Sequence, residues 1–281
     1  MVVPTHRHDR EPVAVSRPPR ALDPRSFPGV GPVAVAALVF LYAPILITTL
    51  YAFNGGEQAL VWEGFSTRWF GYVLTNTAMI ETAVTSLQLA VVATVASVIL
   101  ALAFVLAADG LRRSGAALAN SLLAAPLVIP EVVLAVATLG FIRFIGLQPG
   151  FTALVLAHTT FCIPFAMMPI RSRLQGLGRE VFEAGADLGA RSSAMLTRIT
   201  LPLLVPGIVS GALLAFVVSM DDFIISAFLS SAGSTTLPVY LFSLIRRGPS
   251  PAINVVAVLL LALAVLITTV SYLAPWKKRS A

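Results

Sequence analysis

Six long apolar stretches constrain this chain more than any other feature of its sequence. The predicted spans are Val30–Phe53, Ala83–Ala108, Leu118–Phe141, Phe151–Ile170, Leu203–Leu229 and Ile253–Leu273. Each is long enough for a helix to cross a bilayer, which takes roughly 20 residues. Inside a bilayer every backbone polar group needs a partner within the protein, so spanning segments are helices or closed barrels. We therefore expect an all-α membrane protein with six transmembrane helices.

Composition supports a membrane bundle. The chain is 57% hydrophobic and 11% charged, whereas soluble domains carry about 25% charged residues. Prolines lie inside the spans at Pro44, Pro126, Pro130 and Pro164. Such prolines are tolerated where neighbouring helices or a water-lined cavity satisfy the freed backbone groups. This pattern favours a bundle around a pathway over a set of isolated anchors.

The basic residues indicate an orientation. If the N-terminus is cytoplasmic, fifteen of the 19 Lys and Arg residues fall on the cytoplasmic side, as the positive-inside rule requires. The net charge of +6 is therefore interpreted as a topological signal, and no nucleic-acid partner is expected. We predict a disordered cytoplasmic tail over 1–28, a six-helix domain over 29–275 and a cytoplasmic C-terminal tail over 276–281.

The most polar interior segment, Glu180–Pro202, lies between the fourth and fifth spans. It is expected to form two short helices outside the bilayer. Gly189 suits the position after the first helix, because glycine enters the left-handed region freely. Ser192 or Ser193 can cap a second helix, which we expect to end at Pro202. The apolar residues that can supply a packing surface on the first helix are Val181, Phe182, Ala184, Ala186 and Leu188.

Within this segment a fixed pattern resembles the EAA loop of ABC importer permeases. The matching residues are Glu183, Ala184, Gly185, Gly189, Ile199, Leu201 and Pro202. Gly185 stands where a second alanine is usual, which costs a helix about 1 kcal/mol. The resemblance implies that these residues couple the chain to a cytoplasmic ATPase, within a loop over 171–202. The alternative is a surface helical hairpin without a partner.

Three acidic residues fall within the predicted spans: Glu131, Asp221 and Asp222. An acid at bilayer depth costs about 2.5–3.5 kcal/mol and normally faces a cavity or a partner. We predict that these three line the substrate pathway. Successive helix positions are about 100° apart, so one aspartate is expected to line the pathway while the other pairs or caps locally. The alternatives are pairing with Arg143 or His158, capping of a broken helix, and stabilisation of Glu131 by a helix N-terminus.

The sequence offers few other residues for catalysis or metal binding. His158 is interpreted as a hydrogen-bonded packing residue, with a ligand role as the alternative. No catalytic set or metal site is expected, because no suitable spacing of ligands occurs, and no cofactor is expected. The only lysines are Lys277 and Lys278, so no Walker A loop, which needs a lysine after its glycines, is present. ATP hydrolysis is therefore expected in a separate chain.

Over residues 30–275 the chain resembles the spermidine/putrescine ABC permease family. Segments that carry the resemblance are Leu41–Ile45, Phe53-Asn54, Trp62–Phe65, Pro130-Glu131, His158–Phe165, Ser219–Asp222 and Ser250–Asn254. The resemblance implies the type I ABC importer permease (MetI-like) fold, in the inner membrane of a bacterium with both termini cytoplasmic. It also implies polyamine as the cargo.

Several partners follow from the same resemblance: ABC ATPase subunits, a second homologous permease, an external substrate-binding protein and the lipid bilayer. The first outer loop, Asn54–Ile80, is interpreted as an interfacial segment or as a contact surface for the delivery protein. Two alternatives stay open for the function. One is a permease for another small organic solute, such as an amino acid derivative or an opine. The other is a channel or anchor protein outside the ABC class.

Overall fold

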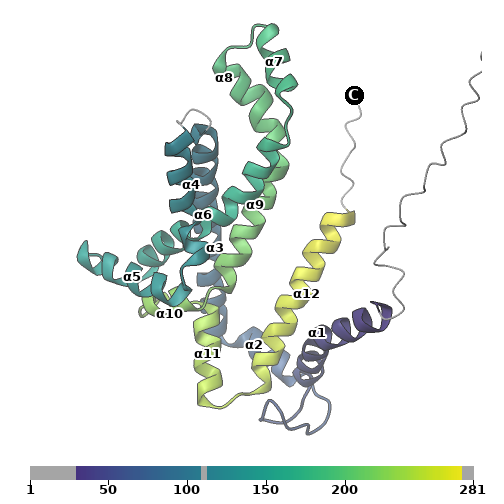
Figure 1. Ribbon diagram of the computed structural model, residues 1–281. Helices are drawn as coiled ribbons and strands as arrows, with labels where there is room; N and C mark the ends of the chain where they lie inside the picture. Colours follow the sequence, from purple (N-terminus) through teal and green to yellow (C-terminus); the bar gives the residue numbers. More distant parts are fainter. Residues whose placement is uncertain (1–29, 109–112, 274–281) are drawn as a thin grey trace, which may run out of the picture. The chain divides into compact units, whose positions relative to one another are not determined.

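A computed structural model describes residues 30–108 and 113–273, and its named elements are all helices (Figure 1). The predicted tails, 1–28 and 276–281, lie outside the described residues. The chain divides after Thr48 into two units, and each is described by itself.

In the first unit, the described residues form the part of α1 (Val30–Ala52) up to Thr48. Its large apolar side chains are exposed, with Phe40 at 81%. Pro44 lies inside the helix, and the Thr48 hydroxyl donates a hydrogen bond to the Pro44 carbonyl at 2.9 Å. A helix that is apolar all round needs lipid or protein around it.

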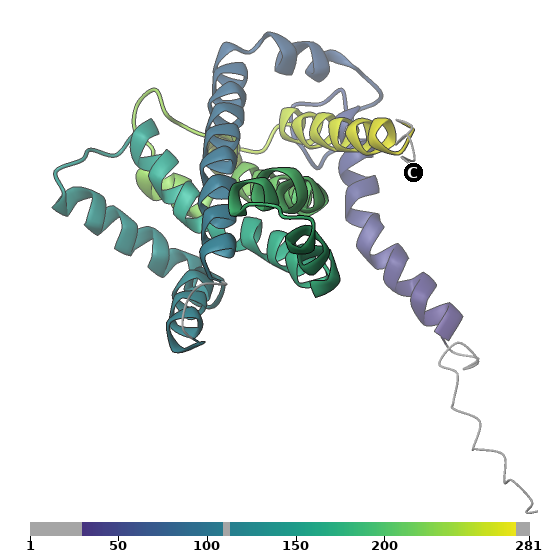
Figure 2. The ribbon, with the colours of Figure 1, turned by 90° about the horizontal axis from the view of Figure 1, so that it is seen from above.

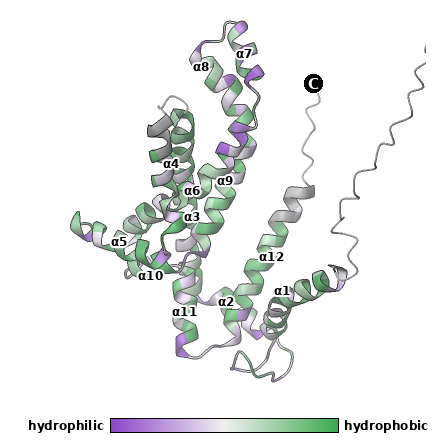
Figure 3. Cartoon of the chain, viewed as in Figure 1, coloured by the Kyte–Doolittle hydropathy of each residue, from purple (hydrophilic) through white to green (hydrophobic). Residues whose placement is uncertain are grey.

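Each of the six predicted apolar spans is helical. Among the described residues, four helices are long and apolar enough to cross a membrane, and five spans result if one bent pair counts as a span. The four are Gly31–Ala52, Thr77–Ala108, Phe151–Gln175 and Ser192–Asp221. α12 (Pro251–Leu273) adds a shorter apolar stretch, Pro251–Leu266. Hydrophobic residues run along α3, α9 and α12, whereas hydrophilic residues gather at α7 and α8 (Figure 3).

The third span is not one straight helix. It consists of α4 (Arg113–Val128) and α5 (Glu131–Phe144), and the two helices are bent by 117° at the break between Val128 and Glu131. Pro130 precedes the first residue of α5. Proline has no N–H and restricts the residue before it, which ends one helix and permits another to start. The predicted span Leu118–Phe141, which contains Pro126 and Pro130, is therefore interrupted at Pro130, whereas α4 continues through Pro126.

The fifth span is also broken. α9 (Leu201–Asp221) ends where the backbone of Asp222 becomes extended, and the short helix α10 (Ile224–Leu229) follows. The expected single span Leu203–Leu229 is therefore wrong after Asp221. A sequence rich in apolar residues on both sides of the break gave no signal for it except the two adjacent aspartates.

The core of the second unit is built by α3 (Thr77–Ala108), α6 (Phe151–Gln175) and α9, which pack against one another. One cluster joins Ala101 of α3, Ala166 of α6 and Ala215 of α9. Small residues let helix backbones approach closely where lipid removes the hydrophobic driving force. Seen from above, α5 extends away from this core (Figure 2).

At the other end of the unit, α2 (Arg68–Thr75), α11 (Leu237–Arg247) and α12 form a second cluster around Val73, Leu237 and Val255. The loop before α2 is organised by Asn54, which is fully buried. Its side-chain amide donates to the carbonyls of Gln58 and Val61 at 3.1 and 2.6 Å. Its carbonyl accepts the N–H groups of Gly56 and Glu63 at 3.1 and 2.9 Å.

Candidate functional site

The polar segment after α6 forms α7 (Arg179–Asp187), a turn at Gly189, and α8 (Ser192–Ala194). Gly189 has φ +75°, as predicted for a residue after a helix C-terminus. The N–H of Ala190 donates to the carbonyl of Gly185, and the N–H of Gly189 donates to that of Ala186. These two bonds make a Schellman motif, which satisfies carbonyls that the end of α7 would otherwise leave unpaired.

The second helix of this segment differs from the prediction. Arg191 occupies the cap position and its side chain makes no capping hydrogen bond, so Ser192 and Ser193 are not the caps. α8 passes into a π-helical turn, Met195–Thr200, and then directly into α9. Leu201 and Pro202 are the first two residues of α9, and Pro202, which has no N–H for the helix ladder, lies where the π-helical turn passes into α9. The helix therefore continues past Pro202 as far as Asp221.

Gly185 faces inward from α7 and is buried. A Cβ placed there would lie 2.8 Å from Met195 Cε and 2.9 Å from Ile199 Cδ1. The π-helical turn thus fills the space that the usual alanine would take. Ile199, another residue of the pattern, is one of the two side chains that meet α7.

Glu183 and Ala184 face outward. The Glu183 side chain is 67% exposed and approaches Arg179 at 3.9 Å between Oε1 and Nε, a surface pair that contributes little to stability. Leu188, expected to pack, is 88% exposed. Beside α7, a cavity of about 690 Å³ is lined by Phe104 of α3, Leu174 of α6 and Phe182 of α7, and Glu183 also borders it. α7 therefore rests mainly on the π-helical turn that leads into α9.

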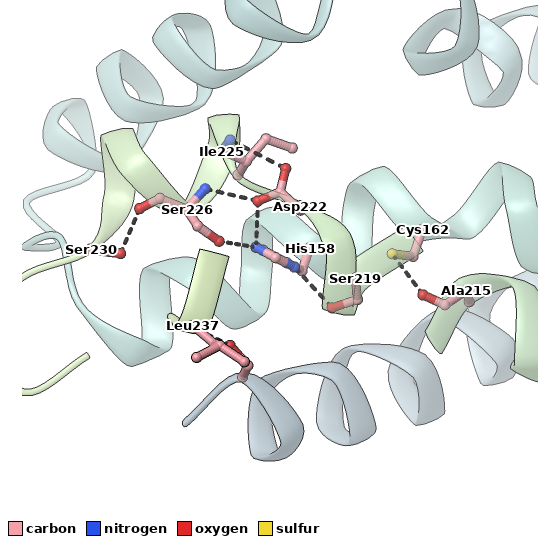
Figure 4. A network of polar contacts seen from close by, with 10 residues as sticks. His158, Cys162, Ala215, Ser219, Asp222, Ile225, Ser226, Ser230 and Leu237 are labelled. Atoms are coloured by element: carbon pink, nitrogen blue, oxygen red, sulfur yellow. Dashed lines mark hydrogen bonds and ion pairs between the residues drawn. The ribbon is translucent and has the colours of Figure 1, made fainter. Parts of the chain in front are cut away.

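The predicted acids meet at the break between α9 and α10. Asp222 is 5% exposed, and its carboxylate accepts the N–H of Ile225 at 3.3 Å and that of Ser226 at 2.9 Å (Figure 4). It therefore caps α10. Oδ2 also lies 3.3 Å from His158 Nε2. Of the two alternatives considered for the aspartates, capping and pairing with His158 are both found at Asp222.

His158 is fully buried on α6. Its Nδ1 lies 2.9 Å from Ser219 Oγ of α9, and its Nε2 lies 3.2 Å from Ser226 Oγ of α10 (Figure 4). An ionised carboxylate can only accept hydrogen bonds, so the Nε2 that faces Asp222 carries a hydrogen. In the neutral imidazole Nδ1 is then the acceptor, and the Ser219 hydroxyl donates to it. Arg143, the other predicted partner, instead donates to Gln148.

Glu131 and Asp221 complete the group. Glu131 is the first residue of α5, a position that favours a carboxylate because of the helix dipole. Its carboxyl group lies next to that of Asp222 and is near enough to Asp221 to interact electrostatically. Asp221, the last residue of α9, is exposed. The structure thus brings the three predicted acids together, with Asp222 buried and Asp221 open.

Two glycines that fix the geometry were not predicted. A Cβ on Gly207 would lie 2.7 Å from Arg173 Cβ, and one on Gly211 would lie 2.5 Å from the Ala166 carbonyl oxygen. Both belong to α9 and face α6. They form a G-x-x-x-G pattern in an apolar helix, which is a known signal for close helix packing and was available in the sequence.

Comparison with known proteins gives the class. The sequence profile of the family described as binding-protein-dependent transport system inner membrane component matches residues 99–279, and the chain belongs to this family. It is therefore the membrane permease subunit of an ABC importer, as the EAA-type pattern predicted. Non-ABC channels and anchors are excluded by this membership.

Particular relatives are permeases whose names specify polyamines. The chain is 39% identical over 239 residues to the putrescine transport system permease protein PotI of Escherichia coli K12, covering 82% of this chain and 84% of the relative. It is 35% identical over 234 residues to the spermidine/putrescine transport system permease protein PotC of Haemophilus influenzae, covering 83% and 91%.

A solved bacterial ABC transporter that imports the acidic polysaccharide alginate has a chain of the same fold. The TM-score is 0.62 at 16% identity, covering 93% of this chain and 100% of that one. An amino acid ABC transporter gives a TM-score of 0.57 at 20% identity, covering 73% and 96%. These likenesses confirm the predicted ABC permease fold.

Proposed function

We propose that this permease carries a polyamine such as putrescine or spermidine across the membrane. The observation that carries the proposal is the group of three carboxyl groups at the outer break of α9, Glu131, Asp221 and Asp222. The names of the relatives support the same cargo. A flexible cation with two or more ammonium groups needs several carboxylates along its path.

Asp221 and Glu131 are the acids best placed to meet the cargo. Asp222 is occupied by two backbone N–H groups and by His158, whereas Asp221 is exposed and Glu131 is half-buried. An ammonium group that loses water in a low-dielectric site is stabilised strongly by an adjacent carboxylate. We therefore assign direct contact to Asp221 and Glu131, and shaping of the site to Asp222.

Coupling to ATP hydrolysis is assigned to the outward face of α7. Glu183 and Ala184 are exposed, and so is Leu188 at the tip of the helix. An exposed leucine at the end of a polar helix suits a protein contact better than water. We infer that α7 docks on a separate ATPase subunit, which hydrolyses the nucleotide, while Gly185, Gly189, Ile199, Leu201 and Pro202 shape the docking element.

The remaining partners and the membrane topology are proposed from family membership and from the distribution of basic residues. Family membership indicates an inner membrane component of a system that uses a binding protein. We propose that the termini and α7 are cytoplasmic, because the basic residues gather on that side. A second homologous permease would complete the pathway. The loop held by Asn54 faces outward in this topology and offers exposed Leu60 and Phe65, at 76% and 74%, to the lipid interface or the binding protein.

Replacing Glu183 with Lys tests the coupling assignment. The variant should insert in the membrane at the normal level and lose co-purification with the ATPase, because the charge on the docking face is inverted. Arg179→Ala is the matched control on the same helix, since it removes a partner of a weak surface pair. Unchanged co-purification of the Glu183→Lys variant would show that α7 is not the docking helix.

Stimulation of ATP hydrolysis tests the cargo. The reconstituted complex, with its ATPase, second permease and binding protein, should hydrolyse ATP faster with putrescine or spermidine present than without a solute. Stimulation by an amino acid derivative or an opine, with none by polyamines, would transfer the assignment to that solute. Stimulation by anionic solutes alone would contradict a cationic cargo.

A further inference from the structure

α6 and α9 leave the coupling loop in opposite chain directions and touch at every turn. Nearest the loop, Arg173 Nε donates to the Leu203 carbonyl at 3.0 Å. One turn further out Gly207 faces Arg173 and Pro169, and then Gly211 faces the Ala166 carbonyl. Each step advances four residues on α9 and three or four on α6, which keeps the same faces together along both helices.

The contact continues to the outer end. Cys162 Sγ lies 3.5 Å from the Ala215 carbonyl, and one turn beyond it His158 Nδ1 meets Ser219 Oγ at 2.9 Å. Because glycine and backbone atoms form much of this seam, α6 and α9 have no room to slide independently. The two helices are thus in close contact from the coupling loop to the break after α9.

His158 also holds what lies beyond the break. Its Nε2 faces Asp222 and Ser226, and the same aspartate caps α10 through two backbone N–H groups. α10 in turn packs against α5, whose first residue is Glu131. A single side chain of α6 thus contacts the end of α9, the residue at the break and the start of α10 (Figure 4).

We propose that His158 is a positioning residue that latches the outer break of α9 to the α6–α9 pair. Movement of the coupling loop then reaches α10, α5 and the acidic group as one displacement. Any buried imidazole needs hydrogen-bond partners, but the three of His158 are drawn from α9, the break and α10, so one side chain ties these three parts to α6. The inference rests on the proposed transport function, and concerns how hydrolysis is converted into transport.

His158 lies far from the coupling loop, so its positioning role can be tested separately from ATPase docking. His158 lies seventeen residues before the end of α6, or about 26 Å of helical rise. A change at the latch therefore leaves α7 and its docking face intact. Loss of the imidazole removes one of the three hydrogen-bond donors of the buried Asp222 carboxylate, which loosens the break because a hydrogen bond to a buried charge is costly to lose.

The test is the number of solute molecules imported per ATP hydrolysed in proteoliposomes that hold the full complex, with putrescine as the probe. His158→Phe should retain ATP hydrolysis stimulated by the loaded binding protein, whereas the transport ratio should fall about tenfold, the scale set by losing a hydrogen bond to a charge. His158→Gln, whose amide can still donate toward Asp222, should recover most of the ratio. Thr160→Val, an exposed position two residues along α6, should match the wild type.

An unchanged ratio in His158→Phe, or an equal fall of hydrolysis and transport, would overturn the latch. If His158→Phe does not assemble, Ser226→Ala decides: it removes one contact of the imidazole and keeps the backbone cap, so a lowered ratio supports the latch and a wild-type ratio rejects it. A wild-type complex that ignores putrescine contradicts the proposed cargo instead, and the ratio is then measured with the solute that the wild type imports.

Discussion

Gly185 and Gly189 lie four residues apart at the end of α7, and each is glycine for a different reason. Gly185 leaves space for Met195 and Ile199, so its role is packing. Gly189 has open space around it but φ +75°, so its role is backbone conformation. The sequence predicted the second role correctly, because a helix terminus has a local signature. It could not predict the first, because the neighbours come from a π-helical turn ten to fourteen residues away.

Replacing Gly189 with Ala should destabilise the coupling loop by about 1–2 kcal/mol, the cost of a side chain in the left-handed region. Thermal unfolding of the purified protein and binding of the ATPase should both show the loss. Gly140→Ala is the control, since Gly140 lies in α5 with no neighbour within 4 Å and no positive φ. Equal behaviour of the two variants would contradict the backbone role of Gly189.

Substitution of Asp221 and of Asp222 should have different effects on stability. Asp222→Asn places an amide against two N–H donors and the imidazole, so it should lower stability by about 1–3 kcal/mol as well as transport. Asp221→Asn should change stability by less than about 0.5 kcal/mol, because the side chain is exposed, and should still reduce uptake of a cationic solute. Unfolding curves and uptake rates of both variants check this. Wild-type uptake in Asp221→Asn would remove that residue from the pathway.

At the scale of elements, prolines indicated one of the two helix breaks, and the adjacent aspartates indicated the other only in part. Pro126 and Pro130 indicated an interrupted third span, and the structure bends it by 117°. The break after Asp221 has no proline, and only the two adjacent aspartates pointed to a broken helix there; the contact of Asp222 with His158 on another helix could not be placed from a local pattern. The pattern of Gly207 and Gly211 indicates that α9 packs closely against another helix, but it does not indicate that this helix is α6.

Gly211→Ala should separate α6 from α9. The added Cβ would lie 2.5 Å from the Ala166 carbonyl oxygen, and a backbone atom cannot rotate away as a side chain can. Overpacking of this kind costs about 1–3 kcal/mol, which thermal unfolding should detect. Gly71→Ala in α2, where the added Cβ would meet no atom of another element within 4 Å, should show no such loss. A Gly211→Ala variant as stable as the wild type would contradict a close seam.

At the scale of the whole molecule, the class was predictable because it rests on features that need no tertiary information. Apolar spans follow from bilayer thickness, and the EAA-type pattern is contiguous in sequence. For Glu131, Asp221 and Asp222 the sequence predicted a common role along the substrate pathway, but not that they lie beside one another. Their different environments arise from α5, α6, α9 and α10 together, which a single sequence does not show.

Together, these features suggest how ATP hydrolysis reaches the acidic residues. α7 rests on the turn that leads into α9, and α9 packs closely against α6 through glycine; we propose that an ATPase acts on the outward face of α7 and that α6 and α9 then move together. The displacement reaches the acids through Asp222 and His158. In this account a cation is released from Asp221 and Glu131 when their surroundings shift.

Uptake of labelled putrescine into proteoliposomes tests the central claim most directly. With the complete complex, ATP on the side of the ATPase and loaded binding protein on the other, the account predicts accumulation of putrescine that stops when ATP is withheld. It also predicts that Asp221→Asn lowers this accumulation while the complex stays assembled. ATP-dependent accumulation of an anionic solute, with none of putrescine under the same conditions, would contradict it.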